Sequence, residues 1–214
     1  SKSFAQRAIV AAALAEGTSH LKGYTPCGDN EAALSVARSL GAQVEVDGSL
    51  VTITGIGASA GCLSSLSGQD GSASDAMTLN VGESGLLTRM MIPVMAQLSP
   101  VPVTFTGEKT LLGRPLTGAK EIMEAFDAKL ASLPADVVAD TTSTGIPSVS
   151  DVIPGEVEVI DRVAEADAKE SPAPVRVPLS VQGPLKAGRA EVSGKHGSQL
   201  ISGLLMALPF ADRN

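Results

Sequence analysis

Aromatic residues, basic residues and cysteines are all scarce in this chain, and each scarcity excludes a class of function. Aromatic residues make up 2% of the 214 residues and tryptophan is absent, so the stacking platforms on which single-stranded nucleic acids bind are missing. The 16 basic residues are outnumbered by 23 acidic ones, and the net charge of −7 argues against nucleic acid as a partner. An anion site in this protein must therefore be local rather than a basic face.

The cysteines and histidines form no recognisable chemical site. Cys27 and Cys62 have no CxxC spacing and no accompanying histidine, so no zinc site is indicated. A reduced protein is the simpler interpretation, and a single disulfide between them stays open. His20 and His196 are the only histidines, and no Ser–His–acid set accompanies them. The sequence also lacks a Walker lysine motif and a dinucleotide fingerprint, so we expect no metal and no cofactor.

Long apolar runs are missing too. The sequence has no signal peptide and no apolar stretch of about 18 residues, so we expect a soluble cytoplasmic protein that does not bind membranes. With 214 residues the chain can form one large domain or two small ones around a sizeable core.

The first 80 residues show a clear order of elements. SKSFAQR leads into the helix formers of 8–17, with Ser1 or Ser3 as the N-cap and a glycine at the end. A strand over 20–24, a helix over 31–40 and a hairpin around Asp47-Gly48 follow. A Gly/Ser-rich loop occupies 55–76.

The same order then recurs, which indicates a repeated supersecondary unit. An apolar helix within 81–99, a strand within 100–108 and a helix within 113–130 form the second copy, and a third start lies within 189–210. We expect an α/β fold in which the apolar helices pack together inside and the sheets lie outside. The predicted units are approximately 1–78, 79–135 and 175–214, with a flexible, Pro- and acid-rich insertion at approximately 134–174 that embeds a short strand near 156–160.

Small, cationic and amide residues gather at the predicted helix starts. If the helices pack side by side, their N-termini converge and offer unpaired N–H groups to a small anion. The alternative is a set of capped helices whose cations are merely solvated. The residues concerned are Lys2, Ser3 and Arg7, the 83–85 turn, Arg114 in a loop, and Ser198 with Gln199.

Four strings of this sequence together resemble the 5-enolpyruvylshikimate-3-phosphate (EPSP) synthase family, and they occur in the family's order. They are SKSFAQRA, NVGESGLLTRMM, TFTGEKTLLGRPL and VSGKHGSQLISGLLMALP. The resemblance implies the inside-out α/β architecture of βαβαββ units. It also implies a carboxyvinyl transferase of the shikimate pathway of aromatic amino-acid biosynthesis, which moves the enolpyruvyl group of phosphoenolpyruvate onto the 5-hydroxyl of shikimate 3-phosphate and releases phosphate.

The resemblance also implies which residues hold the two substrates. For shikimate 3-phosphate it implies Lys2, Ser3, Arg7, Gly197, Ser198 and Gln199. For phosphoenolpyruvate it implies Lys2, Gly85, Arg114 and Gln199.

Three positions depart from the family pattern. Glu83 stands where asparagine is frequent, and its carboxylate would repel phosphoenolpyruvate unless it is paired. Leu86 replaces a common threonine and so lacks a hydroxyl at the helix start. Gly197 replaces the first of two serines and leaves only a backbone N–H for phosphate.

The resemblance covers one of the family's two lobes, with the third unit incomplete and a sheet edge exposed. The family's catalytic carboxylates lie in the other lobe, so no catalytic residue is identified here and we expect this chain alone to bind shikimate 3-phosphate without turning it over. Two alternatives stay open. One is a UDP-N-acetylglucosamine enolpyruvyl transferase; that family uses a loop cysteine, and Cys27 lies in the wrong unit to be this residue. The other is a non-catalytic anion-binding domain.

Overall fold

The computed structural model describes residues 1–57, 77–134, 174–186 and 198–213. The first segment folds as α1 (Lys2–Leu14), β1 (Thr18–Lys22), α2 (Gly28–Ser39), β2 (Gln43–Asp47) and β3 (Leu50–Thr54). Its three strands form an antiparallel sheet in the order β1-β3-β2.

The later segments build a second sheet and the helices that cover it. Its strand order is β4-β5-β7-β6, in which β4 and β5 are parallel and the other pairs are antiparallel. The elements are β4 (Met77–Asn80), α3 (Gly85–Leu98), β5 (Val103–Thr106), η2 (Lys109–Leu111), α4 (Ala119–Ala125), β6 (Lys129–Ser132), β7 (Leu179–Gln182), α5 (Gln199–Ala207) and η6 (Leu208–Arg213).

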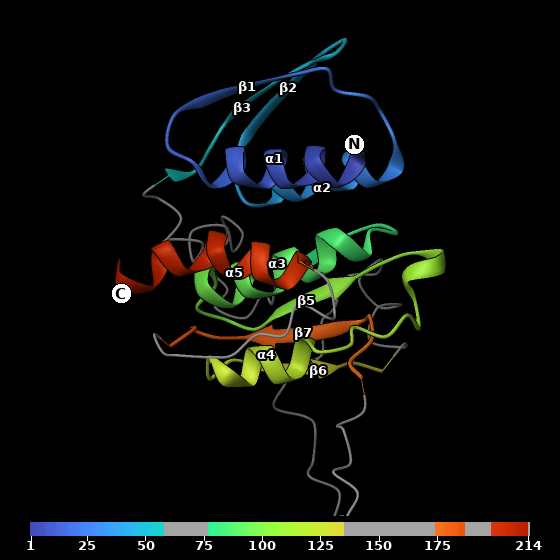
Figure 1. The fold of residues 1–214 in the computed structure, drawn as a ribbon, viewed down its shortest axis with the longest axis vertical. Helices are drawn as coiled ribbons and strands as arrows, with labels where there is room; N and C mark the ends of the chain where they lie inside the picture. The colour runs from blue at the N-terminus through green and yellow to red at the C-terminus, as the bar shows by residue number, and fades with distance from the viewer. Residues whose placement is uncertain (58–76, 135–173, 187–197, 214) are drawn as a thin grey trace, which may run out of the picture.

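Helices α1, α2, α3 and α5 lie between the two sheets, as predicted for the apolar helices, whereas α4 lies beside β6 (Figure 1). Figure 1 shows α1 and α2 beneath the three-stranded sheet and α3 and α5 above the four-stranded one, so the helical layers meet in the middle. Helix α3 is the centre of this interior, because every residue from Met90 to Leu98 is buried. The fold is therefore α/β, with α1, α2, α3 and α5 inside (Figure 1).

Close contact between α3 and α5 depends on a glycine. A Cβ atom at Gly203 would lie 2.2 Å from the carbonyl oxygen of Met90 and 2.6 Å from Cγ of Pro93. No real Cβ atom tolerates such a distance to backbone, so any larger residue forces the helices apart.

Several predicted boundaries in the first segment differ from the structure. Ser1 is the N-cap, without a side-chain hydrogen bond, and α1 ends three residues before Gly17, because Ala15 is already extended. Helix α2 begins at Gly28 rather than at 31, because the carbonyl of Cys27 accepts the first helical N–H groups. The hairpin at Asp47-Gly48 is confirmed, with Gly48 at φ +56°.

The segment 113–130, predicted as a loop that leads into a helix, differs from the structure at its C-terminal end, because α4 already ends at Ala125. Asp127, two residues after the last residue of α4, adopts φ +61°, a left-handed conformation that cannot continue a right-handed helix. Residues Lys129 and Leu130 then pair with β7 as the start of β6. Strands β4 and β7 were not predicted at all.

Other predictions fall outside the described residues. These are most of the Gly/Ser-rich loop, the insertion apart from residues 134 and 174, the strand near 156–160, and the positions of Cys62, His196 and Gly197. Among the residues that are described, Cys27 carries a free thiol. Within the described ranges, no helix has both the length and the apolar character needed to cross a bilayer.

Candidate functional site

A buried hydrogen bond holds the start of α1 beside the start of α3. The hydroxyl of Ser84 donates to Oε1 of Gln6 over 2.6 Å, and the two residues are only 3% and 2% exposed. The same hydroxyl accepts the backbone N–H of Leu87 at 3.1 Å and so caps α3. One serine therefore both begins α3 and fixes it against α1.

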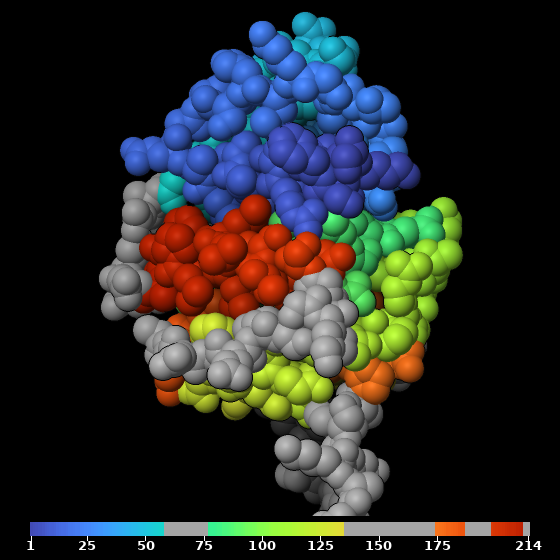
Figure 2. All heavy atoms as spheres, viewed as in Figure 1, coloured from blue at the N-terminus to red at the C-terminus, as the bar shows by residue number. Residues whose placement is uncertain are grey.

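The start of α5 is joined to α1 by Arg7. Its Nη2 donates to Oγ of Ser198 and its Nε to Oγ of Ser202, both over 3.2 Å. Its Nη1 donates to the carbonyl of Ser3 at 3.0 Å. Figure 2 shows the blue N-terminal helix and the red C-terminal segment side by side on one face of the molecule. The N-termini of α1, α3 and α5 therefore meet.

A pocket of about 330 Å³ lies where these helix starts meet. Its cationic side chains are Lys2, Arg89 and Arg114, and its anionic ones are Asp29 and Glu83. The remaining lining residues are Ser3, Gln6, Ser84, Gly85, Leu86 and Gln199. Three cations and several hydroxyl, amide and helix N–H groups around one small hollow suit a small anion.

Two guanidinium groups approach each other over Gly85. A Cβ atom at Gly85 would lie 3.0 Å from Nη1 of Arg89 and 3.5 Å from Nη1 of Arg114. Arg89 is held in place because it donates to the carbonyls of Gly85 and Pro115, both at 3.0 Å. Burial and the charge of Arg114 both lower the pKa of Arg89. An anion between the two arginines would relieve this repulsion.

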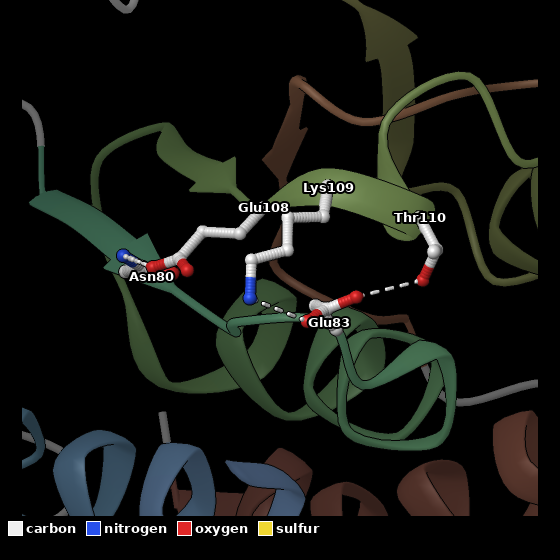
Figure 3. A network of polar contacts seen from close by, with 5 residues as sticks. All are labelled: Asn80, Glu83, Glu108, Lys109 and Thr110. Atoms are coloured by element: carbon white, nitrogen blue, oxygen red, sulfur yellow. Dashed lines mark hydrogen bonds and ion pairs between the residues drawn. The ribbon is translucent and has the colours of Figure 1, made fainter.

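The carboxylate of Glu83 is paired, which answers the concern raised by the sequence. Its Oε1 accepts from Nζ of Lys109 at 3.2 Å and its Oε2 from Oγ1 of Thr110 at 3.0 Å (Figure 3). These hydrogen bonds, that of Thr110 first, hold the pKa of Glu83 below its ordinary value. The negative charge therefore stays but is balanced by a local cation.

The structure brings together most of the residues singled out in the sequence. The pocket contains Lys2, Ser3, Gly85, Arg114 and Gln199, whereas Arg7 and Ser198 lie beside it and bind each other. Gly197 is outside the described residues. The role of each residue toward a ligand stays a prediction.

Sequence reasoning missed three lining residues: Gln6, Asp29 and Arg89. Arg89 had a usable signal, because it is a lone cation in an apolar helix one turn after Gly85 and so shares its face. Ser84 also supplies the hydroxyl that Leu86 lacks at this helix start.

A second hollow of about 660 Å³ adjoins the first and has a different character. Its acidic side chains, Asp29, Glu31, Glu83 and Glu108, outnumber Lys2 and Lys109. We therefore take the smaller pocket as the candidate anion site. Across the part of the chain that the structure describes, no three His, Cys, Asp or Glu side chains gather as a metal site.

The family model and the relatives that match this chain carry the same enzyme name. The family model described as EPSP synthase (3-phosphoshikimate 1-carboxyvinyltransferase) matches residues 1–152. A 3-phosphoshikimate 1-carboxyvinyltransferase from Methanoculleus marisnigri is 29% identical over all of this chain and 39% of its own length. One from Gloeobacter violaceus is 34% identical over 60% of this chain and 28% of its own length.

Solved structures give the same fold. An EPSP synthase from Acinetobacter baumannii superimposes on 97% of this chain with a TM-score of 0.64 and 21% sequence identity. That match covers 36% of the solved chain. The present chain thus spans well under half the length of the relatives that it matches.

Proposed function

The chain belongs to the EPSP synthase family, and on that premise we propose that it forms one lobe of a 3-phosphoshikimate 1-carboxyvinyltransferase. The whole enzyme would transfer the enolpyruvyl group of phosphoenolpyruvate to the 5-hydroxyl of shikimate 3-phosphate and release phosphate. The observation that supports this most is the pocket in which Lys2, Arg89 and Arg114 face the starts of α1 and α3. Both substrates carry a phosphate and a carboxylate, so both need such cations.

Shikimate 3-phosphate would bind on the α1–α5 side of the pocket. Arg7 offers a planar fork suited to a carboxylate, and Ser198 and Ser3 lie within its hydrogen-bonding range. Gln199 lines the pocket next to them. Gly197 stays a predicted ligand through its backbone N–H. Ligand binding would replace some of the hydrogen bonds that Arg7 now makes to α5.

Phosphoenolpyruvate would bind on the α3 side. Because Gly85 has no side chain, the guanidinium groups of Arg89 and Arg114 can both lie close to the start of α3, where a phosphate could contact both. Lys2 lies in the same pocket and could reach either substrate. A lysine between two anionic ligands would lower their mutual repulsion.

The second lobe of the family enzyme would be the partner of this one. The resemblance assigns the acid–base carboxylates and further phosphoenolpyruvate ligands to that lobe, so we propose that this chain alone binds shikimate 3-phosphate but does not turn it over. The cytoplasmic location and the absence of nucleic-acid and membrane partners stay predictions from the sequence.

Calorimetric titration of the chain tests the assignment. We expect shikimate 3-phosphate to bind with a Kd in the high-micromolar to millimolar range, roughly −4 to −6 kcal/mol. UDP-N-acetylglucosamine is the matched comparison, and preferential binding of that sugar nucleotide would contradict the proposal. Absence of binding by both ligands would instead favour a domain without this function.

A further inference from the structure

Two loops that border the anion pocket are joined by a small polar network. The turn between β4 and α3 carries Glu83, and the loop after β5 carries Lys109 and Thr110. We call these three residues the clasp. Figure 3 shows the Glu83 carboxylate between the two partners, with one oxygen facing each. Both oxygens of one carboxylate are therefore used to connect the loops.

Backbone hydrogen bonds bring the loops within reach of the clasp. The N–H of Val81 donates to the carbonyl of Thr106 at 3.0 Å, and the N–H of Glu108 donates to that of Gly82 at 2.9 Å. Lys109 adopts φ +42°, in the left-handed region that L side chains seldom enter. A lysine held in such a conformation needs surrounding contacts to keep it there.

The loop that the clasp holds leads directly to the pocket. Arg114 follows η2, and its N–H donates to the carbonyl of Leu111 at 3.1 Å. Leu111 is fully buried and anchors the inner side of the loop, whereas the clasp ties its outer side to α3. The position of the Arg114 guanidinium relative to Gly85 thus depends on both anchors.

We propose that Glu83 is a positioning residue for the phosphoenolpyruvate anion, acting through Arg114, an inference that rests on the proposed function. Glu83 lines the pocket, so its charge by itself would oppose anion binding. Its two hydrogen bonds instead hold the loop of Arg114 against the start of α3. Lys109 offsets part of the repulsion, because its Nζ lies 3.2 Å from Oε1 of Glu83.

The two roles of Glu83 predict opposite results for one substitution. If repulsion dominated, Glu83→Ala would tighten phosphoenolpyruvate binding. If positioning dominates, the same change releases the loop and weakens binding by about three- to tenfold, the effect of losing one or two ordinary hydrogen bonds. Shikimate 3-phosphate, which we place at Arg7 and Ser198, should bind within about twofold of the wild-type affinity.

The test is calorimetric titration of the full chain with phosphoenolpyruvate and, separately, with shikimate 3-phosphate. Glu108→Ala is the matched control, because it also removes one glutamate, at the position next to Lys109. Glu108 accepts a hydrogen bond from Asn80 at 3.3 Å and does not line the smaller pocket. Thr110→Val removes one hydrogen bond of the clasp and keeps both charges. Thr110→Val should weaken phosphoenolpyruvate binding as Glu83→Ala does. If Glu83→Ala does not fold, Thr110→Val alone tests the inference.

Selective weakening of phosphoenolpyruvate binding in Glu83→Ala and Thr110→Val, with Glu108→Ala unchanged, supports the inference. Unchanged or tighter phosphoenolpyruvate binding overturns it, and so does an equal loss of both ligands, which would mark Glu83 as a purely structural residue. If the wild-type chain binds neither ligand, the proposed function fails and the inference falls with it. Failure of the inference alone is recognised when the wild-type chain binds shikimate 3-phosphate but either does not bind phosphoenolpyruvate or binds it with an affinity that the clasp variants do not selectively weaken.

Discussion

Arg7 has an observed structural role and a proposed binding role, and the energies of the two can be separated. It binds Ser198 and Ser202 of α5 and the carbonyl of Ser3, yet it is only partly buried at the rim of the pocket. Hydrogen bonds of this exposure contribute little to folding, whereas a bidentate contact with a ligand carboxylate contributes about 1.5–3 kcal/mol. Its main effect should therefore be on binding.

We predict that Arg7→Ala weakens shikimate 3-phosphate binding about tenfold or more and lowers the Tm by only a few degrees. Calorimetric titration and thermal melts of the same samples measure the two effects. Arg38→Ala removes an exposed arginine from the last turn of α2 and should leave both values unchanged. A variant that melts much earlier, or binds as well as wild type, would show that Arg7 acts in the fold alone.

Gly85 matters because its lack of a side chain lets two guanidinium groups lie close to it. Its Cα faces Arg89 and Arg114, and an added Cβ would lie 3.0 Å from the first and 3.5 Å from the second guanidinium nitrogen. We predict that Gly85→Ala displaces the Arg89 side chain, because the added methyl carbon would lie 3.0 Å from its Nη1, and thereby weakens phosphoenolpyruvate binding severalfold. Binding of shikimate 3-phosphate should change little.

Gly28→Ala is the control for this prediction. Gly28 also begins a helix beside the larger hollow, but a Cβ there would have no atom within 4 Å. Titration of both variants with both ligands measures the contrast. Equal effects of the two alanines on phosphoenolpyruvate binding would show that the close space over Gly85 is irrelevant to the ligand.

At the scale of elements, α3 and α5 pack in close contact, and Gly203 makes this contact possible. A Cβ added at Gly203 would lie 2.2 Å from the Met90 carbonyl oxygen, which is backbone and cannot rotate away. We predict that Gly203→Ala lowers the free energy of unfolding by about 1–3 kcal/mol or more, because overpacking forces the helices apart. Thermal and denaturant unfolding measure it.

Leu205→Ala serves as the reference on the same helix. Leu205 is 67% exposed, so its truncation removes little buried surface and should leave the Tm nearly unchanged. If Gly203→Ala were as stable as Leu205→Ala, the close helix contact would not limit the packing.

Local chemistry explains which elements the sequence could predict. The hairpin at Asp47-Gly48 follows from a two-residue turn that needs positive φ, and the apolar run of α3 indicates a buried helix whatever surrounds it. Strand β6 could not be found this way. Lys129 follows a helix-like stretch and becomes a strand only through pairing with Gln182, far along the chain.

The candidate site shows the same difference between features that the local sequence indicates and features that only the tertiary structure provides. A cluster of cations and small residues at helix starts is visible in the sequence, and so is the expectation that they meet. The contacts that make them meet are not visible in the sequence, because Gln6 and Ser84 are 78 positions apart and neither local sequence indicates the other as its partner. The pairing of Glu83 with Lys109 is equally a product of tertiary structure.

At the scale of the whole molecule, the chain covers 39% or less of the relatives reported above. Enolpyruvyl transfer needs groups that stabilise the transition state from more than one side. The pocket supplies cations and hydrogen-bond donors for binding, whereas its carboxylates, Asp29 and Glu83, include one that is already paired with Lys109 and Thr110. The described pocket is therefore better equipped to hold anions than to move protons.

We predict that the chain alone does not release phosphate from phosphoenolpyruvate in the presence of shikimate 3-phosphate, although we expect it to bind the latter. A phosphate-release assay with both substrates measures this, and a full-length EPSP synthase under the same conditions serves as the positive control. Turnover by the chain on the order of 1 per second or faster, typical of an ordinary enzyme, would contradict the prediction. It would also show that the groups needed for proton transfer lie within these 214 residues, in which case Asp29 would be the first carboxylate to replace.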